Sequence, residues 1–134
     1  MHRTFLKIAA IFGGLGVIVG AFGAHFLKKY ISPDLMTSYH TGVNYQFFHV
    51  FALIVVGLLY KRYPNKWIIW SGRFFIAGII LFSGSLYIIP IAKTINEEGI
   101  DYLGAITPLG GLSFIAGWTS LALGVPKAIH KDSD

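Results

Sequence analysis

Histidine, glutamine and hydroxyl side chains occur inside long uncharged stretches of this sequence, where polar groups are costly. An imidazole can transfer protons, bind haem iron and form hydrogen bonds, so His25 and His49 are the first candidates for a functional role. Gln46 and Tyr45 precede His49 by three and four positions and therefore share a helical face with it. The candidate polar cluster or ligand site consists of His25, Tyr45, Gln46, His49, Ser83, Ser85, Thr107 and Pro108.

The uncharged stretches themselves predict the elements that hold these residues. Residues 8–27, 74–92 and 102–126 carry no charge, and each run is about as long as the roughly 20 residues that a helix needs to cross a bilayer. A fourth run, 35–60, is polar in its first half. Ser32 and Pro33 before it are typical of a helix start, so one long helix is predicted there.

The expected fold class is therefore all-α: a single domain, 1–134, formed by a bundle of four transmembrane helices. The predicted spans are roughly 5–27, 43–61, 70–91 and 103–125. A cleavable signal at 1–27 is the competing interpretation, but its apolar run is longer than a typical signal core, which favours a first transmembrane helix.

Composition excludes several other classes of protein. Of the 134 residues, 54% are hydrophobic and 13% charged, which argues against a disordered chain, a coiled coil and almost any soluble enzyme. There is no cysteine, so disulfides, thiol catalysis and Cys-ligated metals are excluded. The basic residues are scattered, so no nucleic-acid partner is expected.

The distribution of basic residues predicts the orientation. Four spans place both termini on one side, called side A; the opposite side is side B. Eight of the eleven basic residues fall on side A, which the positive-inside rule makes cytoplasmic. They are Arg3, Lys7, Lys61, Arg62, Lys66, Arg73, Lys127 and Lys131, against Lys28, Lys29 and Lys93 on side B. Aromatic belts are expected at Tyr60, Tyr63, Trp67 and Trp70 toward side A, and at Tyr30, Tyr87 and Tyr102 toward side B.

Small residues recur along the first and last predicted helices at spacings of three and four. Residues at such spacing lie in a line along one face of a helix, and because they are small they let the backbones of two helices approach closely in lipid. The predicted helix-packing seams are Gly13, Gly16, Gly20 and Gly23, and Gly110, Ser113, Gly117, Ser120 and Gly124. Whether they face another helix of the same chain or a second copy stays open from sequence.

Several segments together carry a family resemblance. They are Gly20-Ala-Phe-Gly-Ala-His25, Tyr45-Gln-Phe-Phe-His49, Leu81-Phe-Ser-Gly-Ser-Leu-Tyr87 and Leu103-Gly-Ala-Ile-Thr-Pro-Leu-Gly-Gly111, followed by Gly117-Trp118. Nearly the whole chain resembles the membrane family catalogued as domain of unknown function 423, whose animal relatives are called transmembrane protein 256. The resemblance implies a four-helix bacterial inner-membrane protein, and it supplies neither an activity nor a catalytic residue.

Three interpretations of the polar cluster remain open, with its members expected in the half of the membrane next to side B. The first is hydrogen bonding between helices. The second is a site for a quinone or a lipid headgroup at the outer leaflet. The third is a haem held by His25 and His49; His40 points away from His49 and is not a partner. Zinc is disfavoured because no cysteine or membrane-depth carboxylate completes a site.

The expected function is that of an integral membrane protein of unassigned role, a structural or accessory component of a membrane complex. The alternative is a binder or carrier of a small apolar ligand: a lipid headgroup, a quinone or haem. No nucleophile–base pair is apparent, so no enzyme, no cofactor and no metal site is predicted. The expected partners are the lipid bilayer and either a second copy or a larger complex. The expected location is the bacterial cell (inner) membrane, multi-pass, with cytoplasmic termini.

Overall fold

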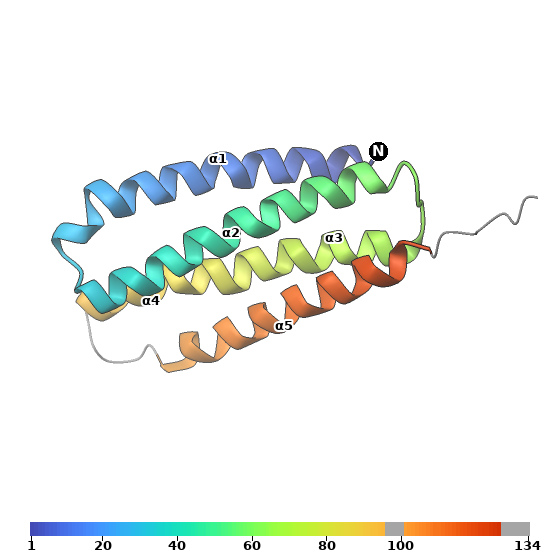
Figure 1. Ribbon diagram of the computed structural model, residues 1–134. Helices are drawn as coiled ribbons and strands as arrows, with labels where there is room; N and C mark the ends of the chain where they lie inside the picture. Colours follow the sequence, from blue (N-terminus) through green and yellow to red (C-terminus); the bar gives the residue numbers. More distant parts are fainter. Residues whose placement is uncertain (96–100, 127–134) are drawn as a thin grey trace, which may run out of the picture.

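The chain is described by a computed structural model that covers residues 1–95 and 101–126 (Figure 1). No strand forms within these ranges, and four helices are long and apolar enough to cross a membrane, so the expected all-α class is confirmed. The elements are α1 (Arg3–His25), the short 3-10 helix η1 (Leu27–Lys29), α2 (Pro33–Leu59), α3 (Lys66–Gly78), the π-helix η2 (Ile79–Ser83), α4 (Gly84–Ile95) and α5 (Asp101–Gly124).

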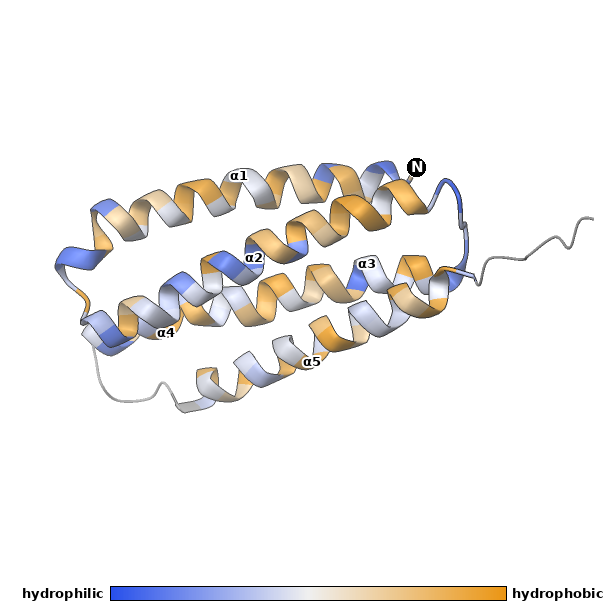
Figure 2. Ribbon diagram, in the orientation of Figure 1, coloured by the Kyte–Doolittle hydropathy of each residue, from blue (hydrophilic) through white to orange (hydrophobic). Residues whose placement is uncertain are grey.

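Elements α3, η2 and α4 form one continuous transmembrane helix, Lys66–Ile95. The other three candidate spans are Arg3–Lys29, Pro33–Leu59 and Tyr102–Gly124. Hydrophobic residues follow these helices along their length, and hydrophilic ones occur at the turns and also within α2 (Figure 2). Two of the side-A cations, Lys127 and Lys131, lie outside the described residues.

Side chains and backbone groups at the helix ends tie the helices together in pairs. Ser32 caps α2 by accepting a hydrogen bond from the Leu35 amide, and Pro33 occupies the first helical position, as the sequence predicts. Asn65 caps α3, and its side-chain amide also donates to the carbonyl of Gly124 at 2.9 Å. The start of α3 is therefore fastened to the end of α5.

Hydrogen bonds at the helix ends join the first two helices in a similar way. The imidazole of His2 caps α1 by accepting from the Phe5 amide, while the backbone amide of His2 donates to the carbonyl of Gly57 at 2.8 Å. Since the start of α1 meets the end of α2, and the start of α3 meets the end of α5, these four helix ends are held in two pairs.

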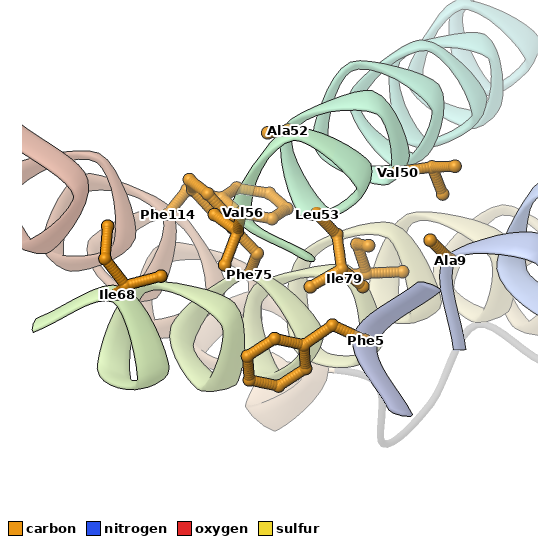
Figure 3. Packing of buried hydrophobic residues seen from close by; sticks show 10 residues of the cluster. All are labelled: Phe5, Ala9, Val50, Ala52, Leu53, Val56, Ile68, Phe75, Ile79 and Phe114. Atoms are coloured by element: carbon orange, nitrogen blue, oxygen red, sulfur yellow. The ribbon is translucent and has the colours of Figure 1, made fainter. Parts of the chain in front are cut away.

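The helices run antiparallel, with α1 packed on α2, α2 on α3 and α4, and α5 on α3 and η2 (Figure 1). Consequently α1 and α5 lie on opposite sides of the molecule. A core of buried residues joins α1, α2, α3, η2 and α5 (Figure 3). Its members are Phe5, Ala9, Val50, Ala52, Leu53, Val56, Ile68, Phe75, Ile79 and Phe114. Many large apolar side chains are exposed instead, including Ile11, Val17 and Ile18 on α1, so the outer surface suits hydrocarbon contact.

The glycines of α1 face α2 within the same chain. A β-carbon at Gly13 would lie 3.6 Å from a methyl group of Val50, and one at Gly20 would lie 3.5 Å from a methyl group of Val43. Gly16 lies against the side chains of Phe47 and Gln46, and Gly23 against the ring of Tyr39. All four small residues therefore sit where α1 approaches α2.

The small residues of α5 face the third transmembrane helix in the same way. Gly117 lies against Phe75, Gly124 against Ile68, and the Ser113 hydroxyl donates to the Phe74 carbonyl at 2.8 Å. Ser120 is buried. Both seams thus meet partners inside one chain, which answers the question that the sequence left open.

The tightest backbone approach occurs at Gly110, which packs against the backbone of Phe82 in the π-helix η2. A π-helix carries an extra residue per hydrogen-bonded turn and therefore widens the helix locally. Only a residue without a side chain fits opposite it. A β-carbon at Gly111, the next residue, would lie 3.9 Å from a ring carbon of Phe82, so this position is not crowded.

These neighbouring glycines give a matched test of the packing. We expect Gly110→Ala to destabilise the protein by about 1–3 kcal/mol, because its methyl group would collide with the Phe82 backbone. Gly111→Ala should leave stability within about 0.5 kcal/mol of wild type. Thermal unfolding in mild detergent measures both; equal melting temperatures for the two variants would show that α5 does not pack on η2 as described.

Candidate functional site

His49 lies at the contact between α2 and α5, where its side chain is buried. Its Nδ1 is 2.7 Å from the carbonyl oxygen of Tyr45, and its Nε2 is 3.2 Å from the indole Nε1 of Trp118. An indole N–H only donates, so Nε2 accepts and the ring proton is on Nδ1, which donates to Tyr45. The imidazole also stacks on the ring of Phe114, with centroids 3.4 Å apart. Both ring nitrogens are therefore already engaged within the chain.

Gln46, one helical turn before His49, points toward α1 and α4 and bridges three helices. Its Nε2 donates to the carbonyl of Phe12 in α1 at 2.7 Å, and its Oε1 accepts from the hydroxyl of Tyr87 in α4 at 2.7 Å. The Gln46 side chain is 4% exposed. An amide that uses both ends in this way is a structural cross-link at membrane depth.

A third polar contact joins α4 to α5. The hydroxyl of Ser85 donates to the Phe82 carbonyl at 2.9 Å, which leaves its oxygen to accept from the hydroxyl of Thr107 at 2.6 Å. Pro108 follows Thr107 but does not end the helix, since α5 continues through it, and its own side chain is exposed. Ser83 is fully buried, and its hydroxyl has no hydrogen-bond partner among the described residues.

The predicted cluster is thus divided into three separate contacts, at Gln46, at His49 and between Ser85 and Thr107. His25 is exposed in the last turn of α1, which packs on α2, whereas His49 is buried against Phe75 of α3 and against Phe114 and Trp118 of α5. The two imidazoles do not meet, and the haem arrangement does not form. Because α2 begins at Pro33, Gln46 and His49 also lie near the middle of the helix rather than toward side B.

Residues that sequence reasoning did not assign complete these contacts. Trp118 holds His49, and Tyr87, expected in the side-B aromatic belt, instead turns inward to Gln46. Tyr39 donates its hydroxyl to the Val19 carbonyl at 2.7 Å. Trp118 and Tyr87 lie 69 and 41 positions from their partners, so no local spacing rule points to them.

A groove of about 560 Å³ lies between α2 and α5, beside His49. Its rim includes the largely exposed side chains of Phe48 and Ile115, so the groove opens sideways, toward the hydrocarbon. The lining residues are Tyr45, Phe48, His49, Phe82, Gly111, Phe114, Ile115 and Trp118. This is the feature of the site that has room for a ligand.

The His49–Trp118 pair generates a double-mutant prediction. His49→Leu should destabilise the protein by about 1–3 kcal/mol, because it leaves the Trp118 N–H unpaired in hydrocarbon. His49→Gln should be milder, since an amide oxygen can accept the same bond. In the His49→Leu/Trp118→Phe double variant the two losses should not add, because no donor is left unpaired. Strictly additive changes in unfolding free energy would exclude this hydrogen bond.

Comparison with known proteins agrees with this architecture. Residues 19–111 match the family model described as "Protein of unknown function (DUF423)". The chain is 38% identical to the UPF0382 inner membrane protein YgdD of Escherichia coli K12, over 96% of this chain and 94% of that protein. It is 39% identical to the UPF0382 membrane protein YwdK of Bacillus subtilis, over 93% and 98%. No solved structure matches the chain. The expected resemblance is therefore confirmed, and the chain belongs to the DUF423 family of membrane proteins.

Proposed function

We propose that this protein is a non-catalytic structural or accessory component of a larger membrane complex. The observation that carries the proposal is that the polar side chains at membrane depth hold the chain's own helices together. Gln46 joins α1, α2 and α4, His49 joins α2 and α5, and Ser85 joins α4 and α5. Polar groups that bond to other helices of the same chain stabilise a rigid bundle. The outward sides of α1 and α5 then remain available for contact with a partner protein.

A carrier requires helices that move apart to open a path alternately to the two sides. The contacts between these helices argue for a fixed arrangement instead. The backbones of α5 and η2 touch at Gly110, and the ends of α1 and α5 are fastened to Gly57 and Asn65. This packing supports the accessory role over the carrier role.

The face available to a partner is the outward side of α1. Its side chains Ile11, Val17, Ile18 and Phe22 are between 45% and 65% exposed, and α1 packs mainly against α2 alone. A helix with one packed side and a broad apolar free side suits a second transmembrane helix, from another copy or from a different protein.

We further propose that the protein lies in the bacterial inner membrane with both termini in the cytoplasm. Eight of the eleven basic residues support this orientation through the positive-inside rule. Single cysteines in place of Pro64 and Asp34 test it without changing the number of basic residues. In intact cells an impermeant thiol reagent should label the Asp34→Cys variant, and the Pro64→Cys variant only after lysis. Labelling in the reverse order would overturn the orientation.

Photo-crosslinking in native membranes tests the accessory role. A diazirine amino acid at Ile18, on the outward face of α1, should give one discrete protein adduct, whose mass separates a second copy from a different subunit. The same group at Leu53, which is fully buried, is the matched control and should give no adduct between chains. If Ile18 and Leu112, an exposed position on α5, capture only lipid and the extracted protein runs as a single chain, the accessory role is wrong.

A further inference from the structure

We propose that the groove between α2 and α5 binds the ring of a neutral, lipid-soluble carbonyl compound of the quinone class. The proposal goes beyond the accessory role and is independent of it, because it concerns a different face of the molecule from the outward side of α1. It rests on the size of the groove, the chemistry of its lining, its depth in the membrane and one hydrogen-bond donor.

The size and lining of the groove fit a planar ring. Its volume of about 560 Å³ lies within the usual range for small-molecule sites. Aromatic rings supply most of its wall, namely Tyr45, Phe48, Phe82, Phe114 and Trp118, together with the imidazole of His49. Aromatic walls favour flat π-systems, which stack on ring faces or meet ring edges. A flexible saturated chain gains no such orientation from them.

The depth of the groove determines how a ligand arrives. Tyr45, Phe48 and His49 lie near the middle of α2, and Gly111 and Ile115 near the middle of α5. Because the groove opens sideways at this depth, a ligand enters from the hydrocarbon rather than from water. Among the residues that the structure describes, no lysine, arginine, aspartate or glutamate lines the groove, so none of them pairs with a charged ligand there.

Hydrogen bonding narrows the ligand class further. His49 and Trp118 already bond to each other and to the Tyr45 carbonyl. Tyr45 also lines the groove, its side chain is 39% exposed, and its hydroxyl has no hydrogen-bond partner within residues 1–95 and 101–126. A phenol O–H in hydrocarbon without an acceptor is unfavourable, and a ligand carbonyl would satisfy it. A phospholipid chain would fill the groove but leave this donor unpaired.

Trp118 provides a local reporter for the test. The chain has three tryptophans, and only Trp118 lines this groove, whereas Trp67 and Trp70 lie at the start of α3. A Trp67→Phe/Trp70→Phe background therefore leaves one fluorophore beside the proposed ligand. In lipid nanodiscs, decylubiquinone should quench its fluorescence saturably, since quinones quench excited indole on contact.

The decisive variant is Tyr45→Phe, which removes only the hydroxyl. We expect it to raise the apparent dissociation constant of decylubiquinone about tenfold, a typical value for one lost hydrogen bond to a buried ligand. Tyr102→Phe, at the exposed start of α5, is the matched control and should bind as the background does. Thermal unfolding of both variants checks that each is folded.

Two results would overturn the proposal. One is quenching that rises linearly with decylubiquinone and matches that of a tryptophan octyl ester in empty nanodiscs, which would mean partition into lipid without a site. The other is saturable quenching with the same dissociation constant in Tyr45→Phe, which would mean that the groove accepts apolar molecules without recognising a carbonyl. Neither result affects the accessory role, which the Ile18 crosslink tests separately.

Discussion

Hydrocarbon offers no hydrogen-bond partner, so a polar side chain at mid-membrane must find one within the protein. Gln46 shows most clearly how this constraint shapes the molecule. Its amide is buried in the centre of α2, and it is satisfied only because a carbonyl of α1 and a hydroxyl of α4 lie within 2.7 Å on either side. One side chain therefore links three helices by hydrogen bonds.

The glycine seam of α1 is what allows that contact. A β-carbon at Gly16 would lie only 3.1 Å from the side-chain nitrogen of Gln46, so the absence of a side chain there gives the amide access to the Phe12 carbonyl. A similar relation holds between α3 and α5, beside His49. Gly78 accommodates the ring of Phe114, which stacks on His49. The small residues and the polar residues therefore act together. The small residues let the helix backbones approach closely, and this brings the hydrogen-bond partners of the polar side chains within reach.

The helices and their ends could be predicted from the sequence because they depend on local patterns. The contacts between helices could not, because they depend on residues far apart in the chain. Uncharged runs gave the four helices, and Ser32 and Pro33 gave the start of α2, because both signals act over a few residues. The seams were recognisable from spacing, but their partners were not, since spacing shows a face and not what covers it. For the same reason Trp118 was missed as the partner of His49. A haem between His25 and His49 was one of three open interpretations, because similar depth along the helices does not show whether two side chains face each other. In the structure α1 and α5 lie on opposite sides of the molecule, and His49 faces α5.

We infer that Gln46 fixes the position of α1 relative to α4 through its two hydrogen bonds. Pulsed electron–electron distance measurement between spin labels at Ile11 on α1 and Ile88 on α4, both exposed, tests it directly in lipid nanodiscs. We expect one narrow distance distribution in the otherwise wild-type protein and a broader or shifted one in Gln46→Leu, which keeps the side-chain bulk but not the two hydrogen bonds. Identical distributions in the two proteins would contradict it and show that apolar packing alone positions α1.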